Sequence, residues 1–132
     1  MKQQILIIED NEQNMYLLTF LLESHGYEIV QAYNGKDGIR SARERVPDVI
    51  LLDIQLPEMN GYEVAEKIRE TPSLERVPII AVTSYAMPGD REQILAAGAT
   101  GYIEKPINPD TFISQLQEYL PLVANDGTRE QQ

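Results

Sequence analysis

Short apolar runs alternate along the chain with segments of helical spacing. The runs are mostly aliphatic or β-branched and lie at Ile5–Ile8, Glu28–Ala32, Val49–Leu52, Pro78–Thr83 and Gly101–Ile103. Runs of this length, bounded by Gly, Pro, Asn or Asp, are typical of buried strands. The run Val49–Leu52 has no polar alternation, which indicates a central parallel strand covered on both faces.

Between these runs, apolar residues recur three or four positions apart. Met15, Leu18 and Leu22 follow this spacing before Gly26, which can end a helix in the left-handed conformation. Four further helices are predicted from shorter sets: Ile39 with Ala42; Val64, Ala65 and Ile68 after the cap Asn60; Ile94 with Ala97 before Gly98; and Phe112, Leu116, Tyr119 and Leu120 after the cap Asn108 and Pro109.

Five strands that are each followed by a helix predict an α/β fold, a parallel sheet wrapped on both faces. Right-handed crossovers leave few topologies for five such units, and the flavodoxin-like (βα)5 order 2-1-3-4-5 is the commonest of these doubly wound sheets. The length of 132 residues fits one domain.

Composition narrows the class of partner. Eleven basic against twenty-one acidic residues give a net charge of −10, which disfavours direct binding to nucleic acid or to anionic membranes. The absence of cysteine excludes disulfides and thiolate metal sites. The start, MKQQILIIED, lacks a signal-peptide pattern, and no apolar run approaches the ~18 residues of a membrane span. We expect a cytoplasmic protein.

Polar residues follow the predicted strands, where an open parallel sheet places its binding site. The first strand ends in Glu9 and Asp10 and the third in Asp53, and these strands are neighbours in the expected order. Three carboxylates without a nearby base repel one another. A hard cation such as Mg²⁺, which prefers oxygen ligands, would offset this repulsion.

Each of these residues also has a purely structural interpretation. Asp53 ends an aliphatic run, where a charge is costly to bury, but an aspartate at a strand end can also cap a turn. Asp10, or Asn11 after it, can cap the first helix. Lys105 can be a solvated surface residue or, beside the acidic cluster, a point charge for a phosphoryl group.

The fourth and fifth predicted strands add two candidate site residues, Thr83 and Tyr102. Thr83 would place a hydroxyl at the rim of the same pocket, although a β-branched residue is also ordinary in a strand. Tyr102 can be half-buried aromatic packing. The Lys105–Pro106 bond is a candidate cis peptide. The combination of these residues carries more weight than any one of them.

The motifs ILIIEDNEQN, DVILLDIQLPEMNGYE, PIIAVTSYA and GYIEKP occur in this order along the chain. Together they resemble the receiver domains of bacterial two-component response regulators, especially stand-alone receivers and those fused to hybrid kinases. The resemblance extends from Ile5 to Leu120. It implies a receiver domain over residues 1–121 and a short polar tail over 122–132.

The resemblance also implies a role for each candidate residue. Asp53 matches the aspartate that accepts the phosphoryl group, and Lys105 matches the lysine of these sites. Glu9 and Asp10 match the acidic pair that organises Mg²⁺. The resemblance implies that Asp10 and Asp53 are direct metal ligands and that Gln55 is a ligand through its backbone carbonyl. It also implies that the Thr83 hydroxyl moves to the phosphoryl group and that Tyr102 is the aromatic switch behind it.

By the same resemblance, the phosphoryl group comes from a histidine kinase or a histidine phosphotransfer protein, and the product acts on a downstream protein target. Such a domain is not an enzyme for a separate substrate, because it catalyses only its own phosphorylation and dephosphorylation. Gln55 and Tyr85 stand at variable positions that tune the phosphoryl lifetime. The sequence departs from the family pattern at Glu9, where Asp is commoner, and at Ser84, where Ala or Gly is usual.

Three alternative functions fit the predicted fold to differing degrees. A flavodoxin needs a hydroxyl- and glycine-rich phosphate loop where this chain has EDNEQN, which repels an anion. A haloacid-dehalogenase-like phosphatase normally carries Asp-x-Asp, whereas Asp53 is followed by Ile54 and Gln55. A protein-binding module with the receiver fold that acts independently of phosphorylation stays open.

The first helix carries a second feature, because Tyr16, Leu17, Phe20 and Leu21 make it apolar almost all round. Deeper burial is one interpretation, and a docking face for a helical bundle of the phosphodonor is the other. His25, just before Gly26, is expected to be a helix-end residue.

Overall fold

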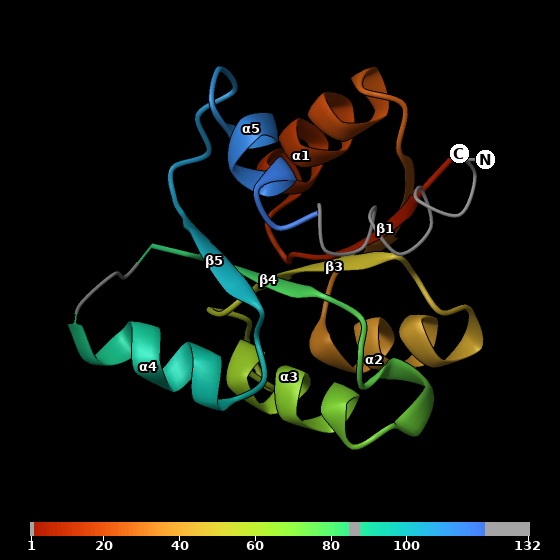
Figure 1. Ribbon diagram of the computed structural model, residues 1–132, viewed down its shortest axis with the longest axis vertical. Helices are drawn as coiled ribbons and strands as arrows, with labels where there is room; N and C mark the ends of the chain where they lie inside the picture. Colours follow the sequence, from red (N-terminus) through yellow and green to blue (C-terminus); the bar gives the residue numbers. More distant parts are fainter. Residues whose placement is uncertain (1, 85–87, 121–132) are drawn as a thin grey trace.

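Five strands form one parallel sheet in the computed structural model, which describes residues 2–84 and 88–120 (Figure 1). The strands are β1 (Gln4–Ile8), β2 (Glu28–Ala32), β3 (Val49–Asp53), β4 (Ile79–Thr83) and β5 (Gly101–Glu104). Their order is β2-β1-β3-β4-β5, which confirms the flavodoxin-like topology expected from the sequence. Tyr85 and the predicted tail over 122–132 lie outside the described residues.

The register of the sheet fixes which side chains meet at its carboxyl edge. Ile8 of β1 is paired with Leu52 of β3, so Glu9 and Asp53 follow side by side. Asp53 is in turn paired with Val82 of β4, one residue before Thr83. The carboxyl ends of the three central strands therefore present Glu9, Asp53 and Thr83 to the same region.

Helices cover both faces of this sheet. They are α1 (Glu12–Ser24), α2 (Gly35–Glu44), α3 (Gly61–Arg69), α4 (Pro88–Ala96) and α5 (Phe112–Gln117), with a short 3-10 helix η1 (Pro72–Leu74) after α3. In Figure 1, α1 and α5 lie on one face of the sheet, and α2, α3 and α4 lie on the other.

The helix boundaries follow from local capping. The side chain of Asn11 accepts the backbone N–H of Asn14 at 2.8 Å and begins α1. Asn60 begins α3 in a capping box with Glu63, as expected of an asparagine before a helix. Gly26 and Gly98 have positive φ angles of 89° and 117°, which confirms that each ends a helix as predicted.

The start of α5 differs from the prediction. Asn108 was expected to cap this helix with Pro109 at its first position, but α5 begins at Phe112 after the cap Thr111. The side chain of Asn108 instead accepts the N–H of Asp110 at 2.9 Å. Asn108 thus closes a tight local turn, which competes with capping for the same oxygen.

Two apolar clusters lie on opposite faces of the sheet. Ile5, Ile7 and Leu51 belong to the cluster that includes residues of α1 and α5. Leu6 and Ile8 belong to the other cluster, with residues of α2 and α3. Every residue of β1 and β3 is buried, which explains the unbroken apolar runs that were used to predict them.

Helix α1 is not buried all round. Tyr16 and Phe20 are 72% and 57% exposed, and their rings stack with centroids 6.4 Å apart. Deeper burial is therefore wrong for these two residues, although Leu21 is buried and Leu17 packs partly against the core. His25 caps the end of α1, as expected, with its Nδ1 2.9 Å from the backbone oxygen of Leu21.

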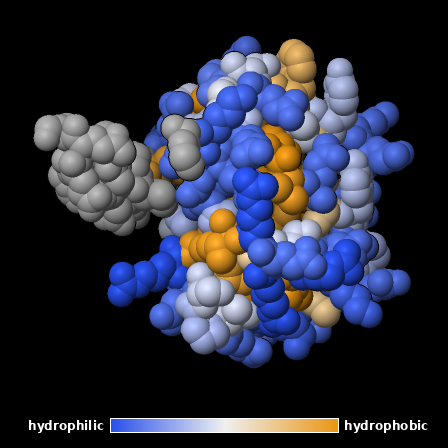
Figure 2. Space-filling view, turned by 90° about the vertical axis from the view of Figure 1, so that its right-hand side faces the viewer, coloured by the Kyte–Doolittle hydropathy of each residue, from blue (hydrophilic) through white to orange (hydrophobic). Residues whose placement is uncertain are grey.

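The surface agrees with the acidic, polar composition. On the face shown in Figure 2, hydrophilic side chains predominate, and hydrophobic side chains show in patches between them. Within residues 2–84 and 88–120, none of the helices has the length and apolarity needed to cross a bilayer.

Candidate phosphoryl-acceptor site

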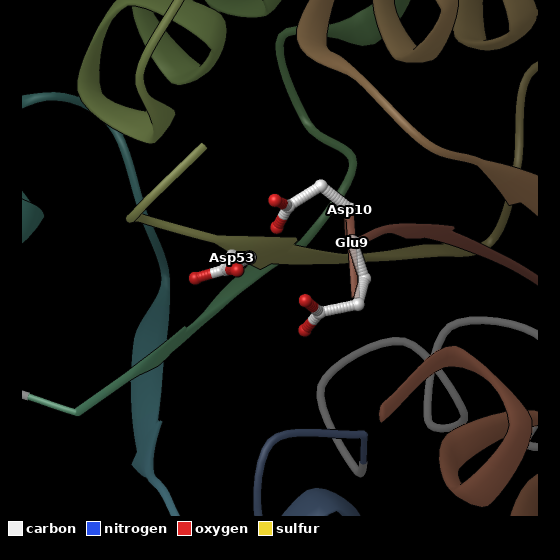
Figure 3. Close-up of side chains that lie close together, drawn as sticks. All are labelled: Glu9, Asp10 and Asp53. Atoms are coloured by element: carbon white, nitrogen blue, oxygen red, sulfur yellow. The ribbon is translucent and has the colours of Figure 1, made fainter. Parts of the chain in front are cut away.

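Three carboxylates meet at the carboxyl ends of β1 and β3. Glu9, Asp10 and Asp53 each offer an oxygen within 4.8 Å of the others. Figure 3 shows the carboxyl groups of Glu9 and Asp10 turned toward Asp53. Glu9 and Asp53 are 1% and 3% exposed, whereas Asp10 is exposed. The arrangement predicted from strand order is therefore present, with two of the carboxylates buried.

The loop after β3 holds the Asp53 carboxylate in place. Its Oδ1 accepts the backbone N–H of Gln55 at 2.9 Å. The loop then returns to the strand, where the N–H of Gly61 donates to the carbonyl of Ile54 at 3.0 Å. A Cβ on Gly61 would lie 2.5 Å from the Ile54 Cα and 2.7 Å from the Asp53 carbonyl oxygen, so only glycine permits this approach.

Lys105 supplies the positive charge beside this cluster. Its Nζ lies 3.1 Å from Asp53 Oδ2 and 3.3 Å from Glu9 Oε1. The lysine side chain is only 14% exposed, so it is not a solvated surface residue. The Lys105–Pro106 bond is cis, as the sequence suggested.

Glu9 is held in an unfavourable environment for a charge. Burial, reinforced by the neighbouring Asp53 carboxylate, raises the pKa of Glu9 to about 7, although the Asn11 N–H and Lys105 act in the opposite direction. Its Oε2 accepts the Asn11 N–H at 3.1 Å, whereas its Oε1 has the Lys105 ion pair but no hydrogen bond.

This cluster fits a hard divalent cation. Three carboxylates face a single ammonium group, so the site is short of positive charge. The donor atoms are all oxygen, and the buried Glu9 Oε1 lacks a hydrogen-bond donor. Mg²⁺ prefers such ligands and typically uses one or two carboxylates together with waters.

Thr83 and Tyr102 lie on the neighbouring strands β4 and β5, where Ala81 is paired with Tyr102. Thr83 ends β4 and is 2% exposed, and its backbone carbonyl accepts the N–H of Lys105 at 2.7 Å. Tyr102 on β5 is half-buried. Its backbone carbonyl accepts the hydroxyl of Tyr119 at 3.2 Å.

One neighbour of Tyr102 was not predicted from the sequence. The guanidinium of Arg91 on α4 lies 5.3 Å from the centre of the Tyr102 ring, within the range of a cation–π contact. An arginine on an exposed helix face carries no sequence signal for such a contact, because it depends on how α4 sits against β5.

Comparisons with known proteins agree with this fold and site. The family model described as "Response regulator receiver domain" matches residues 5–117. The chain therefore belongs to the response regulator receiver domain family. Receiver domains are signalling switches of two-component systems.

Individual relatives share nearly the whole described fold. The polar-differentiation response regulator DivK of Brucella anthropi is 45% identical over 120 residues, which cover 91% of this chain and 98% of that protein. Chemotaxis protein CheY4 of Vibrio cholerae has a TM-score of 0.87 at 29% identity, covering 91% of this chain and 100% of the other.

A third similar structure bears on the acidic cluster. It is the receiver domain of the sensor histidine kinase PA1611 from Pseudomonas aeruginosa PAO1, which holds a magnesium ion coordinated in its active-site cleft. It is 38% identical, with a TM-score of 0.83, and the match covers 91% of this chain and 98% of that one.

Proposed function

We propose that this chain is a phospho-acceptor switch in which Asp53 takes a phosphoryl group from the histidine of a kinase or a phosphotransfer protein. The observation that carries the proposal is the buried Asp53 carboxylate, which has Lys105 Nζ 3.1 Å from one oxygen and the acids Glu9 and Asp10 close by. The fold supports the same function, since receiver domains respond to phosphodonor kinases.

In the proposed reaction, one carboxylate oxygen of Asp53 attacks phosphorus in line with the bond to the donor imidazole. The phosphorus–nitrogen bond breaks, and its electron pair returns to the imidazole nitrogen. The new phosphorus–oxygen bond makes Asp53 an acyl phosphate. The transition state is loose and spreads negative charge over three equatorial oxygens.

Residues of the chain would hold that charge. Lys105, already 3.1 Å from Asp53 Oδ2, would donate to one phosphoryl oxygen. Thr83, at the end of the neighbouring strand, would donate its hydroxyl to another. The Gln55 N–H, bound to Asp53 Oδ1 at 2.9 Å, keeps the carboxylate in a fixed orientation.

Asp10, Asp53 and the backbone carbonyl of Gln55 would hold a Mg²⁺ ion, with Glu9 supporting it. When bound, this ion would neutralise charge on the phosphoryl oxygens. The three carboxylates within 4.8 Å of one another support this assignment.

Phosphorylation would then alter the partner surface. The product adds charge and strong acceptor oxygens at the carboxyl end of β3. Thr83 would turn to this group, and Tyr102 would rotate into the space behind it, which changes the surface formed by α4, β5 and α5. A downstream protein would read that change in the cytoplasm.

The proposal is tested by transfer from a histidine phosphotransfer protein that carries radiolabelled phosphate on its histidine. Label should move to the wild-type chain in the presence of Mg²⁺. It should not move to Asp53→Asn, and Lys105→Ala should slow it strongly. Transfer to Asp53→Asn at the wild-type rate would contradict the assignment of the acceptor.

The second candidate function, a protein-binding module independent of phosphate, makes the opposite prediction. A partner would then bind the wild type with equal affinity before and after phosphorylation. The ion pair of Lys105 with a buried Asp53 favours the switch, because a binding module has no need for a buried, paired acceptor carboxylate.

A further inference from the structure

A groove between α2 and α3 collects cations that the proposed switch does not use. Its volume is about 520 Å³, and its lining includes Lys36, Arg40 and Arg43 of α2 together with Lys67 of α3. The whole chain has only eleven lysines and arginines against twenty-one acids. Four of those eleven therefore gather around one concavity of a strongly acidic protein.

The α2 sequence places its cations on one side of the helix. Lys36, Arg40 and Arg43 follow one another at intervals of four and three residues, so they share a face and extend about 10 Å along the axis. Ile39 lies on the same side and is buried, and with half-buried Met59 it gives the groove an apolar wall.

Close contacts join α2 to α3 and to the segment after α3 on either side of the groove. Near Met59, α2 and α3 approach each other closely. A Cβ on Gly35 would lie 2.6 Å from a Val64 methyl carbon and 3.3 Å from the Met59 carbonyl oxygen. At the Arg43 end, the guanidinium Nε donates to the Thr71 hydroxyl at 3.1 Å, which joins α2 to the segment after α3.

The cations are available to a ligand. Across residues 2–84 and 88–120, neither Lys36 nor Lys67 has an ion-pair partner. Arg40 pairs with Asp37 at 2.9 Å, but both side chains are exposed, and such pairs exchange readily. Glu44 is the single acid in the lining, so with Asp37 beside Arg40 the four cations face two carboxylates.

We propose that this groove binds a nucleoside polyphosphate at a second site, separate from Asp53. The cations along α2 and opposite them on α3 would contact successive phosphates, for which arginine offers paired N–H donors. Ile39 and Met59 would pack against the base. The volume of about 520 Å³ lies in the usual range for small-ligand sites.

The test is titration of the full chain with fluorescent analogues of ATP and GTP, in EDTA so that binding through a metal at Asp53 is excluded. At least one nucleotide should bind saturably, and Asp53→Asn should bind it equally well. Arg40→Glu and Lys67→Glu should each weaken binding about tenfold or more, because each reverses a charge that contacts phosphate. Arg40→Gln should weaken it less.

Arg76→Glu is the matched control, since it makes the same charge change at an exposed position outside the groove. It should change the affinity less than twofold, and thermal melts of all variants verify that they fold. The proposal is overturned if neither nucleotide binds, if Arg76→Glu weakens binding as much as Lys67→Glu, or if an acidic peptide binds this groove and displaces the nucleotide at lower concentration.

Discussion

Replacement of Glu9 by glutamine removes a buried carboxylate whose charged form the folded protein disfavours. Burial and the neighbouring Asp53 raise the pKa of Glu9 from 4.5 to about 7. A raised pKa means that the folded state binds the proton more tightly than the unfolded state does. The contribution of protonated Glu9 to the free energy of unfolding is therefore fully present below about pH 4.5. It is lost as the pH rises through about 7.

The size of the effect follows from the two pKa values. Their separation corresponds to about 3 kcal/mol, an upper bound because Lys105 and Asp53 can adjust when the charge is removed. In the metal-free protein, Glu9→Gln should match the wild type near pH 4.5 and become more stable as the pH rises. Above about pH 7.5 its free energy of unfolding should be higher by up to ~3 kcal/mol.

The assay is urea unfolding in EDTA from about pH 4.5 to about pH 8, followed by circular dichroism. Glu66→Gln, which removes an exposed carboxylate on α3, is the matched control and should stay within about 0.5 kcal/mol of the wild type. Saturating Mg²⁺ should narrow the difference at pH 8, because the ion stabilises the ionised cluster. A difference between Glu9→Gln and wild type that does not grow with pH would refute the reasoning.

Three further substitutions test the loop after β3 and the switch. Gly61→Ala should lower the free energy of unfolding by about 1–3 kcal/mol and slow phosphorylation, because its Cβ would lie 2.5 Å from the Ile54 Cα; unchanged urea midpoint and rate would contradict this. Asn60→Ala should cost about 1 kcal/mol, measured in the same way, because it removes the capping box of α3; Asn60→Asp should retain most of the stability. Tyr102→Ala should accept phosphate at the wild-type rate but lose phosphate-dependent binding to a partner, and equal partner affinity of the wild type with and without phosphate would remove the basis for this prediction.

The sheet and the acidic cluster could be predicted from the sequence because each depends on a strong, local signal. Strands buried on both faces leave unbroken aliphatic runs, as in Val49–Leu52, and a parallel order brings their carboxyl ends to one edge. Once β1 and β3 are neighbours, Glu9 and Asp53 must meet. The caps at Asn60 and Gly26 are equally local.

The features that escaped prediction depend on choices between competing contacts or on tertiary placement. Asn108 had the residue type of a helix cap, but its side chain closes a turn with Asp110. The apolar periodicity of α1 could not distinguish burial of Tyr16 and Phe20 from their stacking on each other in solvent. The Arg91 contact with the Tyr102 ring requires knowledge of how α4 packs, which no sequence pattern contains.

The central claim, that Asp53 is the phosphoryl acceptor of a metal-assisted site, is tested most directly by intact mass spectrometry after incubation with phosphoramidate. The wild type should gain a single phosphoryl group, about 80 Da, in Mg²⁺ but not in EDTA. Asp53→Asn should gain nothing under either condition, and Glu66→Gln should behave as the wild type. A gain of the same mass by Asp53→Asn, or no gain by a folded wild type in Mg²⁺, would contradict the account.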